Sequence, residues 1–200
     1  MEIKLLKDIR LNEHGTLVNM YNEAIHLRQG DMDGACGPYC VVMALLVLGH
    51  IRHDELSPKK IDFRTRVGRL LREIWTLGPM VVNGTPTKKM QNLVKAHNCA
   101  ISNTTTGTGS NLFPLIIEAL NESKPVILDI SGAGLEHWTL AIGYSETHIY
   151  LLDPGYDLAT TSYWNAAIQL NAHAAGIYNY RYANSSCCQK VRVSSIIVLA

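Results

Sequence analysis

The chain has 200 residues, of which 47% are hydrophobic and 18% are charged. This is enough apolar material to bury a full core without a metal ion or a disulfide framework, so we predict a single domain over residues 1–200. The 18 basic and 17 acidic side chains leave a formal net charge of +1, which provides no overall field for an anionic partner. Nucleic acid is therefore not expected as a partner.

Neither a membrane span nor an export signal is visible in the sequence. The longest apolar run, residues 41–48, is far shorter than the roughly 20 residues that cross a bilayer. The N-terminus has no basic segment followed by an apolar stretch, as a secretory signal would have. We predict a protein that is cytoplasmic as synthesised, and delivery by a dedicated secretion system would leave the same pattern.

The cysteines favour a reducing compartment, because there are five of them, an odd number, in a chain without an export signal. Cys40 and Cys99 are interpreted as core thiols, and the vicinal pair Cys187 and Cys188 as unmodified loop cysteines. No set of cysteines and histidines has the paired short spacings of a structural zinc site. We therefore predict no metal and no other cofactor.

The first half of the chain combines an N-terminal hairpin with helices. Residues 2–11 and 16–27 alternate well enough for two strands around a turn, with a helix as the alternative for the second. The apolar run after Cys36 predicts a buried helix that ends near Gly49. Two more helices are predicted, the first of them with an amphipathic pattern, at residues 58–77 and 87–97.

Strands dominate the second half. They are predicted at residues 99–103, 125–130, 135–144, 147–155 and 191–199. A polar loop at 103–111 leads into a helix that runs through Leu120. The segment 156–188 has no steady period and is interpreted as an insertion, whose aromatic residues form either a wall for a substrate or the cover of a sheet edge. The predicted fold class is α+β, with a helical half packed on a twisted antiparallel sheet.

Cys36 has the setting of a nucleophile. The apolar helical run follows it at once, Gly34 precedes it, and Gln29 lies seven positions upstream. The first turn of a helix has unpaired N–H groups and carries the positive end of the helix dipole, and both favour a thiolate. Because the dipole alone is too weak, a cationic histidine partner is also required.

His137 is the candidate partner, near the start of a predicted strand. The next strand ends at Asp153 in the turn sequence Asp-Pro-Gly, and the short link between the strands is typical of an antiparallel hairpin. This pairing would bring Asp153 beside His137, where a carboxylate can hold one imidazole nitrogen while the other faces the thiol. His148 alternates to the opposite face from Asp153 and is a poor base, and His97 lies at a helix end, where a solvated role is the default.

The order Gln29, Cys36, His137 and Asp153 resembles that of the papain-like cysteine peptidases. Within them, the chain is most similar to the peptidases that remove double-glycine leaders from bacteriocins and to their stand-alone relatives, over roughly residues 25–155. The resemblance implies a papain-like fold in which Gln29 serves the oxyanion hole, Cys36 is the nucleophile, His137 the base and Asp153 its orienting acid.

Two departures accompany the resemblance. Gln29 lies one position further from Cys36 than is usual in the family. The segment between Cys36 and His137 is also longer than in the leader peptidases, and in that respect it resembles the papain-like effector proteases that bacteria inject into other cells.

The resemblance implies a thiol peptidase that forms a thioester acyl-enzyme and acts on a peptide or protein substrate. Glycines on both sides of a cleft leave room for an extended chain, so the predicted substrate contacts are Gly34, Gly132, Gly134 and Trp138.

Two alternatives remain open at this stage. The same site also suits a deamidase or transglutaminase-type effector or toxin that acts on side-chain amides, and such a role would add an inhibitor or immunity protein to the expected partners. The second alternative is a module that binds peptides without catalysis. Each site residue alone also has an ordinary role, as a core thiol, a surface histidine or a turn, but their joint occurrence favours catalysis.

Overall fold

The computed structural model describes residues 2–30, 34–57, 61–77, 84–106, 112–170, 178 and 180–200. Several predicted features therefore lie partly outside the described residues. These are the stretch just before Cys36, the start of the helix predicted at 58–77, the end of the polar loop and part of the segment 156–188.

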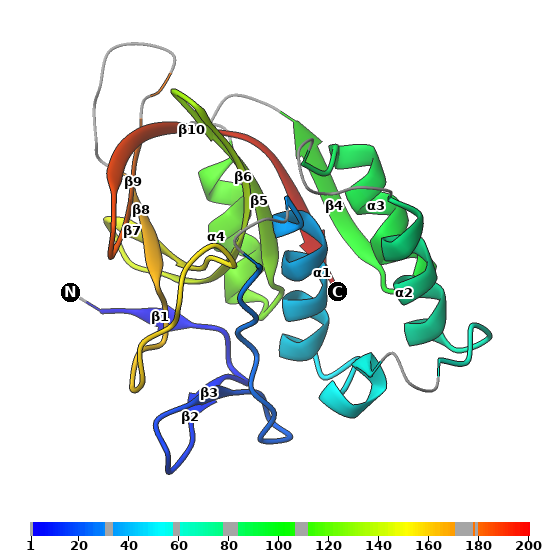
Figure 1. Cartoon of the computed structure of the whole chain (residues 1–200). Helices are drawn as coiled ribbons and strands as arrows, with labels where there is room; N and C mark the ends of the chain where they lie inside the picture. Colours follow the sequence, from blue (N-terminus) through cyan, green and yellow to red (C-terminus); the bar gives the residue numbers. More distant parts are fainter. Residues whose placement is uncertain are drawn as a thin grey trace.

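A large antiparallel sheet forms one side of the molecule (Figure 1). Its strands follow the order β1-β6-β5-β10-β9-β8-β7, and β6 also pairs with β7, so the ladder closes on itself like a barrel. The strands are β1 Lys4–Leu5, β5 Val126–Gly132, β6 Leu135–Tyr144, β7 His148–Leu152, β8 Ala166–Gln169, β9 Tyr180–Asn184 and β10 Cys188–Leu199. Because of this closure, β9 belongs to the same ring of strands as the β6–β7 hairpin.

Strand β10 joins the closed sheet to the helical side. It pairs with β9 near its start, with β5 along its middle and with β4 (Ile101–Thr106) at its end. A register shift between Val193 and Ser195 interrupts its ladder with β5, and such a bulge increases the local bend and twist. The apolar, β-branched sequence of β10 suits this position, because most of its second half is buried on both faces.

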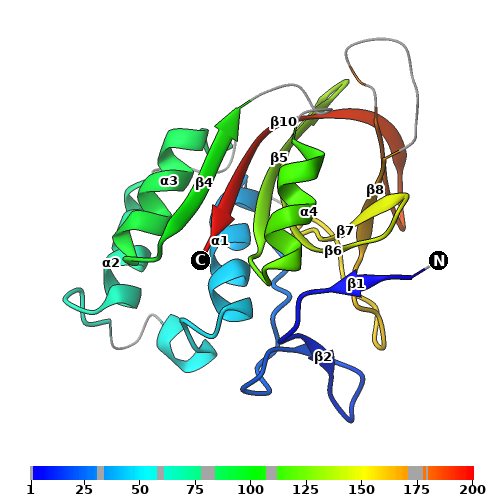
Figure 2. The same ribbon diagram turned by 180° about the vertical axis from the view of Figure 1, so that it is seen from behind.

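Helix α1 (Cys36–Val47) is buried in the centre of the molecule. Its sequence is apolar on all sides, and nearly all of its residues are buried against β5, β6 and α3. Gly49 follows at φ +67°, a left-handed conformation that ends helices and that glycine adopts without strain. Figures 1 and 2 show α1 on one face of β5 and β6, and α4 (Phe113–Asn121) on the other.

Helices α2 (Arg66–Thr76) and α3 (Thr87–Ala96) pack together with α1 and β4 on the side away from the closed part of the sheet (Figure 1). A short 3-10 turn, η1 (His53–Leu56), precedes them. Helix α2 begins later than predicted, because Thr65 Oγ1 accepts the N–H of Gly68 at 2.9 Å and so caps the helix. In the described residues no helix is long and apolar enough to cross a membrane.

The α+β class, with helices packed on an antiparallel sheet, is confirmed. The predicted N-terminal hairpin is confirmed in a shorter form, because β2 (Arg10–Leu11) and β3 (Leu17–Val18) pair antiparallel around the predicted turn. The start of the predicted first strand does not extend this hairpin, because β1 pairs with β6 instead. Local sequence does not specify such a distant partner.

The strand predicted at 99–103 and the region after Asp153 also differ from expectation. Strand β4 continues to Thr106, because residues expected in a polar loop pair with β10. The segment 156–188 contains β8 and β9, which pair with each other and with β7 and β10. These two strands are therefore part of the sheet ladder.

Candidate active site

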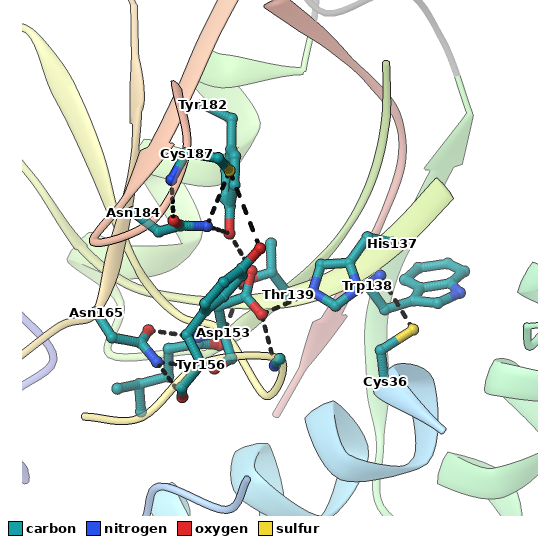
Figure 3. Close-up of polar contacts among 12 residues, drawn as sticks. Cys36, His137, Trp138, Thr139, Asp153, Tyr156, Asn165, Tyr182, Asn184 and Cys187 are labelled. Atoms are coloured by element: carbon teal, nitrogen blue, oxygen red, sulfur yellow. Dashed lines mark hydrogen bonds and ion pairs between the residues drawn. The ribbon is translucent and has the colours of Figure 1, made fainter. Parts of the chain in front are cut away.

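Cys36 is the first residue of α1 and lies against β6. It is only 5% exposed, and its Sγ accepts a hydrogen bond from the backbone N–H of Trp138 at 3.5 Å (Figure 3). The first turn of α1 adds N–H groups without partners inside the helix and the positive end of its dipole. The N–H groups of the first turn and the helix dipole both place positive potential around the sulfur.

The β6–β7 hairpin brings His137 and Asp153 together. His137 lies near the start of β6, Asp153 directly follows β7, and the pairing of Leu140 with Leu152 sets the register. His137 Nε2 lies 2.7 Å from Asp153 Oδ1. Figure 3 shows the imidazole ring between this carboxylate and the sulfur of Cys36. The contact expected between Asp153 and His137 is therefore present.

The surroundings of His137 favour its protonated form. Burial by itself would lower the pKa of His137, because an apolar environment disfavours the charged ring. Hydrogen bonds to Asp153 and Cys36, together with the charges of both groups, act in the opposite direction and raise the pKa of His137 to about 10. A thiol, an imidazole and a carboxylate in this order can act as a nucleophile, a base and an orienting group.

Asp153 is fully buried, and its carboxylate is held by several donors. Oδ1 accepts the N–H of Gly155 at 2.7 Å in addition to its contact with His137. Oδ2 accepts a hydrogen bond from the hydroxyl of Tyr182 on β9. Because a buried carboxylate is costly unless it is hydrogen-bonded, these donors offset the cost of its burial.

The backbone of Asp153 is fixed by Asn165. The N–H of Asp153 donates to Asn165 Oδ1 at 2.7 Å, and Asn165 Nδ2 donates to the carbonyl groups of Asp153 and Tyr156, each at 2.8 Å. Asn165 and Tyr182 both come from the segment 156–188, where the sequence predicted no element. The alternating tyrosines that end at Tyr182 are a period-two signal for β9, whereas Asn165 carries no comparable signal.

A cleft of about 420 Å³ opens at Cys36 and His137. Residues 84–87, which precede and begin α3, form part of its lining. The indole Nε1 of Trp138 donates to the carbonyl of Thr85 at 2.7 Å and ties this segment to β6. The sheet supplies further charged lining residues, Asp129, Glu136 and Arg192. A cleft of this volume can hold a few residues of an extended chain.

Gln29 and Gly34 are not among the described residues that line this cleft. The N–H of Gln29 donates to the carbonyl of Pro154 at 2.8 Å, which holds its backbone next to Asp153. Its side-chain Oε1 is buried and has no hydrogen-bond partner within the described ranges. Gly34 is half-buried near the start of α1.

The other predicted substrate contacts have different surroundings. Gly132 lies so close to β10 that a Cβ atom would meet the carbonyl oxygen of Lys190 at 2.7 Å, so strand packing accounts for the glycine. Gly134 adopts φ +75° in the turn between β5 and β6, and the space around it is open. Among the described lining residues of the cleft, Trp138 is present and these two glycines are not.

A second thiol–imidazole contact joins Cys99 Sγ to His50 Nδ1 at 3.6 Å, but burial raises the pKa of the Cys99 thiol. Cys40, one turn further along α1, is fully buried, and burial raises its pKa well above the usual value, as expected for a core thiol. Within the described ranges, no group of three or more His, Cys, Asp or Glu side chains is arranged to hold a metal ion.

Comparison with known proteins relates most of the chain to one family. The model of the family described as "Peptidase_C39 like family" matches residues 18–187. The matched region contains Cys36, His137 and Asp153, and also the segment that provides Asn165 and Tyr182. No curated protein matches the chain. The resemblance noted in the sequence is thereby confirmed at the level of the family.

Proposed function

Because the chain belongs to the Peptidase_C39 like family, we propose that it is a cysteine peptidase that works through Cys36, His137 and Asp153. One observation carries the proposal: His137 Nε2 lies 2.7 Å from Asp153 Oδ1, and the ring separates this carboxylate from the sulfur of Cys36. Family membership supports cysteine peptidase chemistry in general. The three individual roles rest on the contacts and on the properties of the groups, and a helix-borne cysteine facing a sheet-borne histidine fits a papain-like fold.

The reaction begins from a thiolate and an imidazolium. The thiolate of Cys36 attacks the carbonyl carbon of a peptide bond, and the π electron pair moves to the oxygen. The backbone N–H of Cys36, at the start of α1, donates to this oxyanion, and the amide of Gln29 is the second candidate donor. When the intermediate collapses, the C–N bond breaks and the amine leaves with a proton from His137. A thioester remains on Cys36.

Water completes the cycle. Neutral His137 takes a proton from a water molecule, whose oxygen attacks the thioester carbonyl. The C–S bond then breaks, the new carboxylic acid leaves, and the thiolate and imidazolium are restored. Asp153 holds the ring in one orientation through both proton transfers, a role that suits a carboxylate whose side chain and backbone are both fixed.

The cleft favours a polar, extended peptide as substrate. Asp129, Glu136 and Arg192 line it beside Trp138, and an apolar substrate side chain would desolvate these charges without replacing their hydrogen bonds. The indole of Trp138 provides one broad apolar surface among them.

Alkylation of Cys36 tests the proposal without knowledge of the substrate. Native protein is treated with limiting iodoacetamide from pH 5 to 9, and each labelled cysteine is located by mass spectrometry in the wild type and in His137→Ala. Fast labelling of Cys36 below pH 7 that is lost in His137→Ala supports the thiolate–imidazolium pair. The exposed thiol of Cys188 serves as an internal reference. Slow labelling of Cys36 that does not depend on His137 contradicts the proposal and favours a binding module.

A peptide library then identifies the bond that is attacked. New N-termini that are absent with Cys36→Ala support a peptidase. Release of ammonia from glutamine side chains without new N-termini would show that the protein is a deamidase that uses the same thioester chemistry.

A further inference from the structure

Tyr182 extends the site on the side away from the cleft. It lies on β9, it is almost completely buried, and its hydroxyl donates to Oδ2 of Asp153. The other carboxylate oxygen of Asp153 faces His137. We propose that Tyr182 is a positioning residue, which holds the carboxylate of Asp153 in the orientation that keeps its other oxygen on His137, beside Cys36. The inference rests on the proposed function.

In the described part of the chain, three groups donate hydrogen bonds to the carboxylate of Asp153. Tyr182 is the one that donates to Oδ2. Oδ1 has the N–H of Gly155 and Nε2 of His137, both at 2.7 Å. Among the described residues, the Tyr182 hydroxyl is the hydrogen-bond donor to Oδ2. Because Asp153 is fully buried, loss of this hydroxyl would leave an ionised oxygen without a donor, and such a group costs far more than the average hydrogen bond contributes.

The direction of the Tyr182 hydrogen bond is set by Asn184. Asn184 Nδ2 donates to the Tyr182 hydroxyl oxygen at 3.0 Å, so that oxygen already acts as an acceptor and its own proton points to Asp153. Asn184 Oδ1 in turn accepts the N–H groups of Ser186 and Cys187, each at 2.8 Å, which fixes the amide orientation. Four consecutive hydrogen bonds therefore run from Cys187 in the β9–β10 turn to the imidazole of His137 (Figure 3).

A neutral donor suits this place better than a cation. Burial, and then the neighbouring charge of Asp153, raises the pKa of Tyr182 far above its usual value, so the hydroxyl keeps its proton throughout the working pH range. An arginine or lysine at this point would neutralise Asp153 and weaken its effect on His137. The tyrosine stabilises the carboxylate and leaves its negative charge available to the imidazolium.

The test compares Cys36 alkylation in Tyr182→Phe with that in Tyr180→Phe. Tyr180 lies on the same strand and packs against Phe113, so Tyr180→Phe removes a hydroxyl at a matched position without touching Asp153. In Tyr182→Phe, we expect the pH of half-maximal Cys36 alkylation to rise by about one unit, and the rate at pH 6 to fall about tenfold. Tyr180→Phe should retain the wild-type profile. Superimposable profiles for the wild type and Tyr182→Phe would overturn the inference.

A double mutant separates positioning from general destabilisation. If Tyr182 acts through Asp153, adding Tyr182→Phe to Asp153→Asn changes Cys36 alkylation by less than about twofold. A full, additive tenfold loss would show that the hydroxyl has a merely structural role and would overturn the inference. Because Tyr182→Phe could fail to fold, a fluorotyrosine at position 182 provides a second variant, which keeps the ring and makes the hydroxyl a stronger donor. Its profile is expected to move to lower pH, and a shift to higher pH would contradict the inference.

The outcome for the wild type distinguishes this inference from the proposed function. If wild-type Cys36 shows no fast alkylation below pH 7, the proposed function fails, and the inference falls with it. If the wild type shows this reactivity and Tyr182→Phe retains it, the proposed function stands and the role of Tyr182 alone is refuted.

Discussion

Two histidines in different regions of the molecule, both largely removed from solvent, have pKa values shifted in opposite directions. His137, between the sheet and α1, is flanked by Asp153 and Cys36, and its pKa is raised to about 10. His97, at the end of α3, is completely buried, and neither ring nitrogen has a hydrogen-bond partner in the described residues. Burial, followed by the charges of His50, Arg66 and Arg69, lowers the pKa of His97 to about 4.

The partners of the two rings account for the opposite shifts of their pKa values. Both rings are removed from water, and removal from water by itself favours the neutral form in both cases. The difference lies in the partners, because His137 has a fixed carboxylate on one side whereas His97 faces its neighbour His50 with a ring-centroid distance of 6.3 Å. A perturbed histidine thus indicates chemistry here only where an oppositely charged partner accompanies it.

The largest expected effect comes from removing either member of the thiolate–imidazolium pair. Cys36→Ala and His137→Ala should each reduce turnover of a peptide substrate by at least about 1,000-fold, because the proposed mechanism requires both groups. The rate of peptide cleavage measures this directly. Cys40→Ala, a thiol removal one turn along the same helix, is the matched control and should leave turnover within a few-fold of the wild type. Full activity of Cys36→Ala would refute the assignment.

His97 should make the protein less stable in mild acid. The unfolded chain protonates this residue near the ordinary pKa of 6.5, whereas the folded protein does so only near 4. Between these values the unfolded state binds more protons, so the free energy of unfolding falls as the pH falls from about 6.5 to about 4, by roughly 3 kcal/mol. Urea unfolding at a series of pH values measures this dependence.

The carboxyl groups also contribute to the loss of stability in acid, so a substitution of His97 is needed to isolate its own contribution. His97→Phe, which keeps a ring of similar shape, should flatten the acid branch of the stability curve. His14→Gln, at a histidine whose side chain is 78% exposed, is the control and should leave the curve unchanged. An equally steep acid branch in His97→Phe would show that the unpaired ring is not the cause.

Asp153→Asn should have an intermediate effect on the site. An asparagine keeps an oxygen that can accept from His137, but it loses the negative charge that stabilises the imidazolium. Hydrogen bonds to charged groups are worth about twice those to neutral ones, so turnover should fall about 10- to 100-fold and partial activity should remain. The pH profile of turnover is the diagnostic measurement, because Cys36 should then require a higher pH to react. Wild-type activity with an unchanged profile would exclude Asp153 from the site.

The smallest expected effect is that of a substitution at the start of α2. It tests whether the stability of this helix affects the site around Cys36 and His137. Thr65 caps α2 through its hydroxyl, which accepts the N–H of Gly68 at 2.9 Å. Thr65→Ala should lower the free energy of unfolding by about 1 kcal/mol, and Thr65→Ser, which retains the cap, should cost less. Neither variant should alter the alkylation profile of Cys36. A changed profile would show that the helical region and the site are coupled.

The sequence by itself determined the elements whose patterns are local. The uniformly apolar run after Cys36 predicted α1, which ends within two residues of the expected position. The short link before His148 and the turn sequence after Asp153 predicted the hairpin of β6 and β7. These features depend on neighbouring residues, so periodicity and turn chemistry suffice to predict them.

The tertiary structure alone decided which distant groups meet. Residues 2–11 alternate as a strand does, yet only the fold selects β6 as the partner of β1. Tyr182 and Asn165 reach Asp153 because the sheet closes on itself, and His97 is buried where neither ring nitrogen has a hydrogen-bond partner in the described residues. Each outcome depends on contacts between residues far apart in the chain, which local sequence patterns do not specify.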